Sequence, residues 1–461
     1  MAVACCNSKG FLRLFPIVLL FNTALVLVWR NVQQAQQLTQ TKLLWESNER
    51  ALMPEDDCSK YDNIPKEISP RTLELQELLK CRDRSLRFER IQHGSYWVLQ
   101  NLVIGRKSRD IGCAESITYT TIGDYTFFDN LKPLVERWLA PVSFAIHAPG
   151  YDLKATLDSI LYVRNCLDDN GLIKDWVSFH VYFPNNHMPD KVPFNMAQVL
   201  RRPYTCTFGN GTDVPPPYTL IPRSESYKNT ANLTYPINVG RNIARQAVNT
   251  HFILASDIEL YPSLGFVDFF LDMVAQNHSV LALDPLLPRR VYPLPVFEIA
   301  SGAEIPNDKA DLLALYQKKL AQGFHEKLCG QCHKVPRQKE WLNKPFSEGD
   351  QLQLFSHTLR EKQFRYWEPF YVSDNTEPLF DERVTWEGQS NKRIQNYAMC
   401  LMGYEYHVLH PAFLVHSPGI KKATEGSATR KKYATEMTKF INVKIKPEYH
   451  VLYGRNSACQ T

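Results

Sequence analysis

Two carboxylates separated by one residue directly follow an apolar run in the middle of the chain. The segment HFILAS (residues 251–256) leads into Asp257-Ile258-Glu259. Because side chains alternate along a strand, we expect both acids to project to the same side of a strand end. Carboxylate oxygens bind hard divalent cations, and Mg²⁺ or Mn²⁺ held in this way can bridge the oxygens of a diphosphate. The alternative is an ordinary solvated strand end.

A helix with a polar side is expected just before this strand. In residues 235–248, apolar side chains recur at helical spacing and are predicted to face a sheet, namely Val239, Ile243, Ala247 and Val248. Arg241, Asn242 and Arg245 then lie on other faces, toward solvent or a ligand. An arginine there could pair with a phosphate or carboxylate in bidentate fashion, whereas a solvated arginine is the default on a helix.

The elements that must position these residues alternate along the chain from about Gly94. Short β-rich runs (residues 116–122, 142–148 and 176–183) alternate with helical patterns at residues 127–139 and 153–167. This alternation predicts an α/β fold around a largely parallel sheet. In such sheets a ligand binds beyond the carboxyl ends of the strands, which is where Asp257 and Glu259 are expected.

The composition excludes several classes of protein. Of 461 residues, 44% are hydrophobic and 22% are charged, which is too apolar for a disordered chain and too mixed for a fibrous one. The formal net charge of +5 is small for this length. A broad nucleic-acid binder would carry a larger and more clustered positive charge, so we expect no nucleic-acid partner.

The N-terminal residues predict a membrane anchor. An uncharged run of 16 residues lies between Arg13 and Arg30 and would span about 24 Å as a helix. We expect a cytosolic tail (1–13), a signal anchor (14–30), a lumenal stem (31–92) and a globular domain (93–461). A cleaved signal peptide is the alternative for the apolar run. Cys5 and Cys6 would lie beside the membrane, as palmitoylated or inert thiols.

Sequons and cysteines agree with a lumenal location. Three Asn-x-Ser/Thr triplets begin at Asn210, Asn232 and Asn277, and these asparagines are the predicted glycosylation sites. Nine of the 11 cysteines follow the apolar run, so an oxidising lumen would pair most of them and leave one over. The sequence does not set their connectivity.

One pair of cysteines fits three interpretations. Cys329-Gly-Gln-Cys332-His333 matches a haem-attachment pattern and half of a zinc site. No second Cys-x-x-Cys is present to complete a zinc site. We therefore expect a disulfide that closes a loop.

Seven blocks of sequence, in order, resemble glycosyltransferase family 49 from about Gly94 to Lys422. The order and spacing of the blocks are more specific than any single block. They are YP-x-N-x-x-RN-x-AR (235–245), D-x-E-x-x-PS (257–263), P-x-FE-I (295–299), LC-x-x-C (328–332), WEPFYV (367–372), FDER (380–383) and FLVH (413–416).

The resemblance implies a fold, a location and a reaction. Members have the GT-A fold, a mixed α/β sheet that binds a nucleotide sugar. They are single-pass type II proteins of the Golgi membrane that depend on Mn²⁺, with Mg²⁺ as the alternative. The implied reaction is the inverting transfer of glucuronic acid from UDP-glucuronic acid to a glycan or glycoprotein acceptor, ending in xylose on an O-mannosyl glycan. Homo-oligomers, or hetero-oligomers with other Golgi transferases, are further expected partners.

The resemblance also assigns roles to particular residues. Asp257 and Glu259 match the family's metal-binding acid pair, with Glu in place of the second Asp, and His416 matches a third metal ligand. Lys421 would meet the diphosphate. An inverting displacement needs a carboxylate base, for which Asp381 and Glu382 are the candidates, followed by Glu298. The alternative for Asp381 is an ion pair with Arg383. The remaining candidate substrate contacts are Arg241, Asn242, Arg245 and Trp367. Trp367 and Tyr371 are expected either to form a platform under a sugar ring or to pack in the core.

A second function class stays open at this point. The change from Asp to Glu in the metal motif is compatible with a catalytically silent lumenal homologue that binds glycans or assists another transferase. Retention of both acids, of His416 and of the FDER acids favours the enzyme, because folding does not require all of them.

Overall fold

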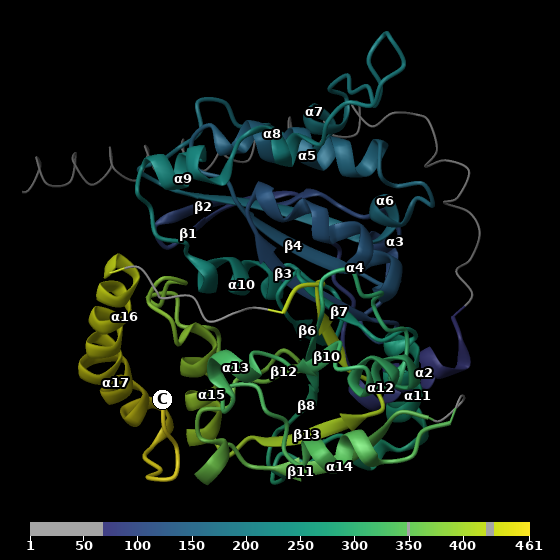
Figure 1. Cartoon of the computed structure of the whole chain (residues 1–461), viewed down its shortest axis with the longest axis vertical. Coiled ribbons are helices and arrows are strands. Elements are labelled where there is room, and N and C mark those ends of the chain that lie inside the picture. The colour runs from purple at the N-terminus through teal and green to yellow at the C-terminus, as the bar shows by residue number, and fades with distance from the viewer. Residues whose placement is uncertain (1–67, 348–350, 421–427) are drawn as a thin grey trace, which may run out of the picture. The chain divides into compact units, whose positions relative to one another are not determined.

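The computed structural model of the chain describes residues 68–347, 351–420 and 428–461 (Figure 1). The predicted tail, the anchor, most of the stem, Cys5, Cys6 and Lys421 lie outside the described residues. None of the helices in the described residues has the length and apolar character needed to cross a membrane.

The larger of two sheets has ten strands and mixes parallel and antiparallel pairs. This corrects the expectation of a largely parallel sheet and agrees with the mixed sheet that the resemblance implied. Strands β3, β4, β5 and β6 form a parallel block, and β2 and β12 pair antiparallel with its two edges. The order is β1 (Glu89–His93), β2 (Tyr96–Val103), β5 (Val177–Pro184), β4 (Val142–His147), β3 (Ile117–Gly123), β6 (Phe252–Ala255), β12 (Phe370–Ser373), β8 (Arg290–Leu294), β13 (Glu405–His410) and β11 (Gln353–Thr358).

A smaller sheet of four strands carries part of the predicted site. Its order is β10 (Ala321–Gly323), β9 (Val296–Ile299), β14 (Leu414–His416) and β7 (Leu260–Pro262). Strand β14 pairs antiparallel with β7 and parallel with β9, so His416 lies opposite Leu260 on one side and Glu298 on the other. This register places His416 beside the segment that carries Asp257 and Glu259.

Helices cover both faces of the parallel block because its strands are apolar on both sides. On β4, Phe144 and Ile146 face the main core with α4 (Leu131–Trp138) and α5 (Asp152–Asn165), whereas Ala145 faces α10 (Ile237–Gln246). Figure 1 shows α5 and α10 on opposite sides of this sheet.

The remaining helices follow in chain order. They are α2 (Pro70–Leu79), α3 (Arg106–Asp110), α6 (Leu172–Trp176), α7 (Met196–Leu200), α8 (Pro217–Leu220), α9 (Tyr227–Thr230), α11 (Phe266–Gln276), α12 (Lys309–Gln317), α13 (Glu326–Cys329), α14 (Gln338–Asn343), α15 (Asn391–Leu401), α16 (Ala428–Phe440) and α17 (Lys446–Tyr453). A π-helical turn at Ile441–Ile445 joins α16 to α17.

The strand order reverses between β3 and β6. After β3 the chain adds β4 and β5 on one side, and it then returns to place β6 on the other side of β3. Crevices at the carboxyl ends of parallel strands form where the order reverses in this way. Asp124 follows β3 and Asp257 follows β6, so the topology brings two carboxylates to one crevice.

Residues 68–92, predicted as the end of the stem, pack on the globular unit. Arg71 of α2 bonds to Asp268 and Asp272 of α11, at 2.9 Å each. A disulfide between Cys81 and Cys113 ties the next segment to the unit, and β1 joins the large sheet. Further disulfides join Cys166 to Cys206 and Cys400 to Cys459.

Candidate active site

Asp257 and Glu259 lie in a turn after β6, whereas we expected them at the end of the strand itself. Strand β6 ends at Ala255, and the amide of Leu260 donates to the carbonyl of Asp257 at 3.0 Å. The hydroxyl of Tyr119 on β3 fixes the turn by donating to the carbonyls of Asp257 and Leu260. Ile258 is buried, while Asp257 and Glu259 line one cavity. Both acids therefore border one cavity, but through a turn and not through the alternation of side chains along a strand.

Two cations hold the carboxylate of Asp257. Arg241 Nη2 donates to Asp257 Oδ1 at 3.0 Å, and Lys392 Nζ donates to Oδ2 at 3.2 Å. Burial by itself would raise the pKa of Asp257, but Lys392 and Arg241 together hold the pKa well below its usual value. Asp257 is therefore ionised at neutral pH, as a metal ligand must be.

His416 presents an unpartnered nitrogen toward the acid pair. Its Nδ1 lies 2.8 Å from the carbonyl oxygen of Ser417, which can only accept, so Nδ1 carries the proton. The other nitrogen, Nε2, is buried, has no hydrogen-bond partner among the described residues and lies 3.8 Å from Glu259 Oε2. A buried lone pair fixed through the opposite ring nitrogen is the usual arrangement of a metal-binding histidine.

A cavity of about 770 Å³ gathers these groups at the carboxyl ends of β3 and β6. Five basic and four acidic side chains line it, so the wall has a small excess of positive charge before any ligand binds. These are Arg223, Lys228, Arg241, Lys392 and Arg393, with Asp124, Asp257, Glu259 and Glu368. A nucleotide diphosphate would bring negative charge to a wall of this composition.

The donor set fits a divalent cation, although its atoms are not yet gathered around one point. Two carboxylates and an imidazole nitrogen suit Mn²⁺ or Mg²⁺. Within the described residues, only Glu361, Cys400 and Cys459 bring three such ligand atoms within 4.8 Å of one another, and there the sulfurs form a disulfide. Asp257 therefore faces its two cations, and it would have to turn toward Glu259 and His416 to complete a metal site.

Of the three predicted polar residues of α10, only Arg241 lines the cavity. All three are buried, and Asn242 and Arg245 face neither solvent nor the cavity, which corrects the expectation for these two residues. Residues 374–383 cover this side of the helix and supply the partners. Asn242 bonds to both backbone atoms of Phe380, and Arg245 forms a buried ion pair with Glu377 at 2.9 Å.

The carboxylates predicted to act as the base lie outside the residues that line this cavity. Asp381 accepts from Arg383 Nε at 2.9 Å and Nη2 at 2.7 Å, so it forms the ion pair considered as the alternative. Glu382 lies 2.6 Å from His93 Nε2, and Glu298 is buried and accepts from the amide of His325. Their catalytic role stays a prediction.

The aromatic residues of the cavity differ from those predicted. Trp367 is 1% exposed and packs in the second hydrophobic core, and Tyr371 donates to Gln395 Oε1 in the same region. Both therefore occupy core positions. Trp386 and Phe324 line the cavity instead, and Trp386 is 41% exposed.

Cys329 and Cys332 form the expected disulfide, and both line the cavity. The disulfide uses both sulfurs, which excludes the haem and zinc interpretations in this state. His333 is buried beside Phe324, and burial lowers the pKa of His333 to about 3, so it is neutral.

The sequence interpretation missed several cavity residues. Asp124 carried a usable signal, because it follows its strand as Asp257 does. Glu368 also carried one, because it lies in the block WEPFYV (367–372). Lys392, Arg393 and Trp386 had none, since contacts between distant segments bring them to the site. Lys392 is 135 residues from its partner Asp257.

Comparison with known proteins identifies the family of this chain. A family model described as "Glycosyl-transferase for dystroglycan" matches residues 116–454, which is well over half of the chain. The chain belongs to this glycosyltransferase family.

The relatives include glucuronyltransferases of two different names. Beta-1,4-glucuronyltransferase 1 of Danio rerio is 29% identical over 305 residues, 65% of this chain and 65% of that protein. The Homo sapiens protein of that name is 28% identical over 301 residues, 64% of this chain and 66% of that protein. The match therefore spans just under two thirds of either. Xylosyl- and glucuronyltransferase LARGE1 of Homo sapiens is 24% identical over 185 residues, 40% of this chain and 22% of that protein.

Proposed function

We propose that the chain is a metal-dependent, inverting glycosyltransferase that moves glucuronic acid from UDP-glucuronic acid to a glycan. The observation that carries the proposal is the cavity in which Asp257, Glu259 and His416 lie beside Arg241 and Lys392. Membership of the family and the names of the glucuronyltransferase relatives support the donor class. By the same resemblance, the acceptor is the xylose-type end of an O-mannosyl glycan.

Different residues of the cavity would bind different parts of the donor. Asp257, Glu259 and His416 would hold Mn²⁺ or Mg²⁺, and the bound cation would neutralise charge that develops on the departing diphosphate. Arg241 and Lys392 line the same cavity and would add fixed positive charge near the diphosphate oxygens. Trp386 lines the cavity and would pack against the bound donor.

We place the general base at Glu368 instead of Asp381. Glu368 lines the cavity, and its Oε1 accepts from Arg393 Nε at 2.8 Å. That bond orients the carboxylate and leaves its other oxygen to receive a proton from an acceptor hydroxyl. Asp381, in contrast, has both oxygens bonded to Arg383.

The test is a panel of UDP-sugars offered to the full chain with Mn²⁺, with UDP release as the readout. We expect UDP-glucuronic acid to be turned over, and EDTA or Asp257→Asn to abolish release. Asp190→Asn is the control, because Asp190 is an exposed acid away from the cavity. If UDP is still released in the presence of EDTA and by the Asp257→Asn variant, Asp257 does not hold a catalytic metal. Glycan binding without turnover of any donor would favour the silent homologue.

We further propose a lumenal location in the Golgi, with residues 14–30 as the anchor. The three sequon asparagines, Asn210, Asn232 and Asn277, are all exposed, as glycan attachment requires. Expression in mammalian cells followed by peptide N-glycosidase treatment should lower the apparent mass. Loss of that shift in the triple Asn→Gln variant would assign it to these sites, and an unshifted wild-type chain would contradict a lumenal domain.

A further inference from the structure

A second pocket adjoins the active-site cavity. It has a volume of about 630 Å³ and lies between the start of α15, the α16–α17 arm and residues 455–461. Ser390 and Arg393 line both this pocket and the cavity that holds Asp257. A ligand in the pocket would therefore border the active-site cavity. We call it the C-terminal pocket.

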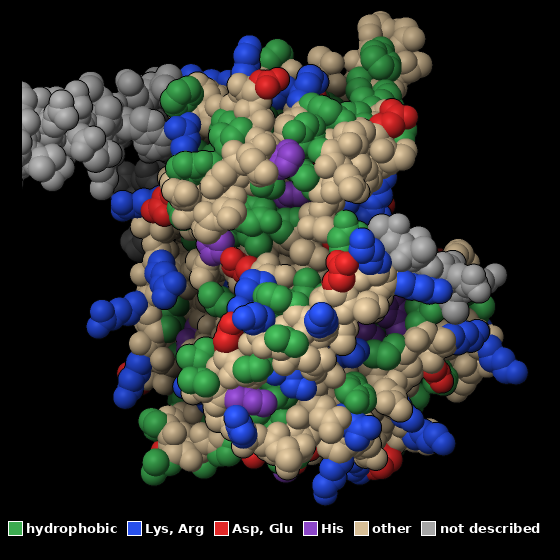
Figure 2. Space-filling model, turned by 90° about the vertical axis from the view of Figure 1, so that its left-hand side faces the viewer, with side chains coloured by type: hydrophobic (Ala, Val, Ile, Leu, Met, Phe, Trp, Pro, Cys, Tyr) green, Lys and Arg blue, Asp and Glu red, His purple; other side chains and the backbone are tan. Residues whose placement is uncertain are grey.

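The side chains that line the C-terminal pocket carry a net positive charge. Arg393, Lys446, His450 and Arg455 line it, and no Asp or Glu side chain is among the described lining residues. Lys446 and Arg455 form no ion pair in the described part of the chain. Nearby Arg383, in contrast, pairs with Asp381 and Glu448. Figure 2, which views the side that carries α16 and α17, shows basic side chains spread over the lower half of that face.

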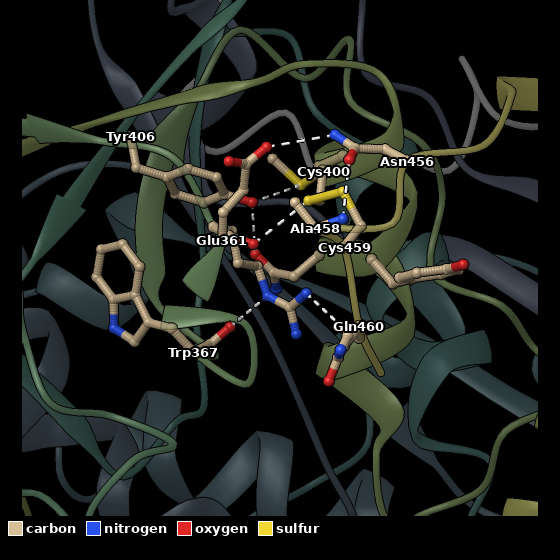
Figure 3. The surroundings of a disulfide bond; sticks show 12 residues. Glu361, Trp367, Cys400, Tyr406, Asn456, Ala458, Cys459 and Gln460 are labelled. Carbon is tan, nitrogen blue, oxygen red and sulfur yellow. Dashed lines mark hydrogen bonds between the residues drawn. A yellow bond between two sulfur atoms is a disulfide. The ribbon is translucent and has the colours of Figure 1, made fainter. Parts of the chain in front are cut away.

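The wall formed by residues 456–460 is firmly held (Figure 3). The disulfide between Cys400 and Cys459 joins it to α15. Arg360, which is fully buried, donates from Nε to the carbonyl of Trp367 at 2.7 Å and from Nη1 to the carbonyl of Gln460 at 2.8 Å. Asn456 donates to Glu361 at 3.3 Å. The pocket is thus formed before a ligand arrives, which lowers the entropic cost of binding.

Arg393 connects this pocket to the proposed base. Its Nε donates to Glu368 in the cavity, and its guanidinium lies 5.5 Å from the ring centre of Tyr366. Tyr366 in turn donates to Gln460 Oε1 at 3.3 Å in the pocket wall. One side chain thus contacts Glu368 and also borders the pocket.

From this arrangement we infer that the C-terminal pocket binds an anionic group of the acceptor, a phosphate or a sugar carboxylate. Lys446, Arg455 and Arg393 recognise the charge, and the neighbouring sugar of the acceptor then reaches Glu368. The inference rests on the proposed function, because it assigns the acceptor side of the same reaction. Charge-assisted bonds from arginine and lysine are the strong interactions available to such a ligand.

Three small probes test the inference on the full chain by saturation-transfer NMR and calorimetry. Glucose 6-phosphate and glucuronic acid carry the two anionic groups, and glucose carries neither. We expect either or both anions to bind at least fivefold more tightly than glucose, and the stronger of the two identifies the group. Raising the salt concentration should weaken that binding. Equal affinity for all three probes would overturn the inference.

Variants locate the binding. Lys446→Gln combined with Arg455→Gln should weaken the anion about tenfold, whereas Lys446→Arg should keep the wild-type affinity. Lys444→Gln is the matched control, because Lys444 lies two residues away, is exposed and does not line the pocket. Unchanged anion affinity in the double variant would overturn the inference. So would a loss that Lys444→Gln reproduces.

A further measurement separates this inference from the proposed function. Affinity for UDP reports only on the donor cavity, so it should be the same in the double variant and the wild type. If no UDP-sugar is turned over but the double variant loses the anion, the proposed reaction fails and the anion pocket stands. If a donor is turned over but the anion does not bind, the pocket assignment fails alone.

Discussion

The carboxylate of Asp257 pairs with two basic side chains and is also a proposed metal ligand, and it cannot fully do both at once. Its oxygens accept from Arg241 and Lys392, yet a divalent cation would need one of them. Arg241 is also held by Asn238 and Asn391, so Lys392 is the partner with fewer restraints. Phosphate oxygens could replace Asp257 as the acceptor for Lys392. We therefore expect the metal and the nucleotide to bind with positive cooperativity.

Glu368 and Asp381 can be distinguished by separate measurements of catalysis and stability. Glu368→Gln should lower kcat by about 10²–10⁴-fold, because it removes the proposed base, and should leave UDP affinity unchanged. Asp381→Asn should keep kcat and lower the free energy of unfolding by about 1–2 kcal/mol, because it weakens the pair with Arg383. Steady-state kinetics and urea unfolding of both variants provide the comparison. A stable Asp381→Asn chain without turnover would return the base to Asp381.

At the scale of elements, α10 is a helix with no solvent face. All nine residues from Ile237 to Arg245 are buried. Its apolar side packs on β4 and β5, and its polar side supplies hydrogen bonds to residues 374–383. The helix thus positions Arg241 at the cavity while Asn242 and Arg245 hold the covering segment. Buried polar groups are tolerated here because each has partners.

Gly240 marks the closest approach of α10 to the sheet. A Cβ at this position would lie 2.6 Å from Oη of Tyr182, which is fully buried and has no room to move. Gly240→Ala should lower the free energy of unfolding by about 1–3 kcal/mol, although alanine is the better helix former. Gly209→Ala is the control, because nothing lies within 4 Å of its Cβ. Urea unfolding would contradict this packing if Gly240→Ala were as stable as wild type.

The sequence predicts the elements better than it predicts their contacts. Periodicity located β3, β4, β5 and α5, because these segments bury side chains at spacings set by their own geometry. The acid pair was found by type and spacing. Arg245 was misread, because residues 374–383 bury it from a distant part of the chain. Lys392 left no local signal for the same reason. Trp367 takes the core position that was left open as the alternative to a sugar platform.

At the scale of the whole molecule, the reversal of strand order between β3 and β6 places the site. The match to the family model begins at residue 116, just before β3, and continues to residue 454. It therefore includes the parallel block, the small sheet with His416 and the α16–α17 arm. The cavity and the C-terminal pocket are both built from this matched region, apart from residues 455–461.

Two buried histidines should make the fold sensitive to acid. Burial lowers the pKa of His147 and of His180 to about 3, whereas both titrate near 6.5 when unfolded. The unfolded chain therefore binds more protons below pH 6.5, so the stability present above that pH is lost as the pH falls toward 3. Neither ring nitrogen of His147 has a hydrogen-bond partner among the described residues.

His147→Phe removes one of these protonations and keeps a ring of similar size. Urea unfolding between pH 7.5 and pH 4.5 should show a smaller loss of stability in the variant than in the wild type. Equal losses in the two proteins would show that His147 does not contribute to acid unfolding.

Direct binding of Mn²⁺ tests whether Asp257, Glu259 and His416 hold a divalent cation beside a nucleotide diphosphate. Electron paramagnetic resonance measures the free Mn²⁺ that remains during a titration of the full chain. With UDP present, we predict one bound Mn²⁺ per chain, weaker binding without UDP, and loss of binding in Asp257→Asn and in His416→Ala. One tightly bound Mn²⁺ in both variants, or none in the wild type with UDP, would show that these three residues do not form the metal site.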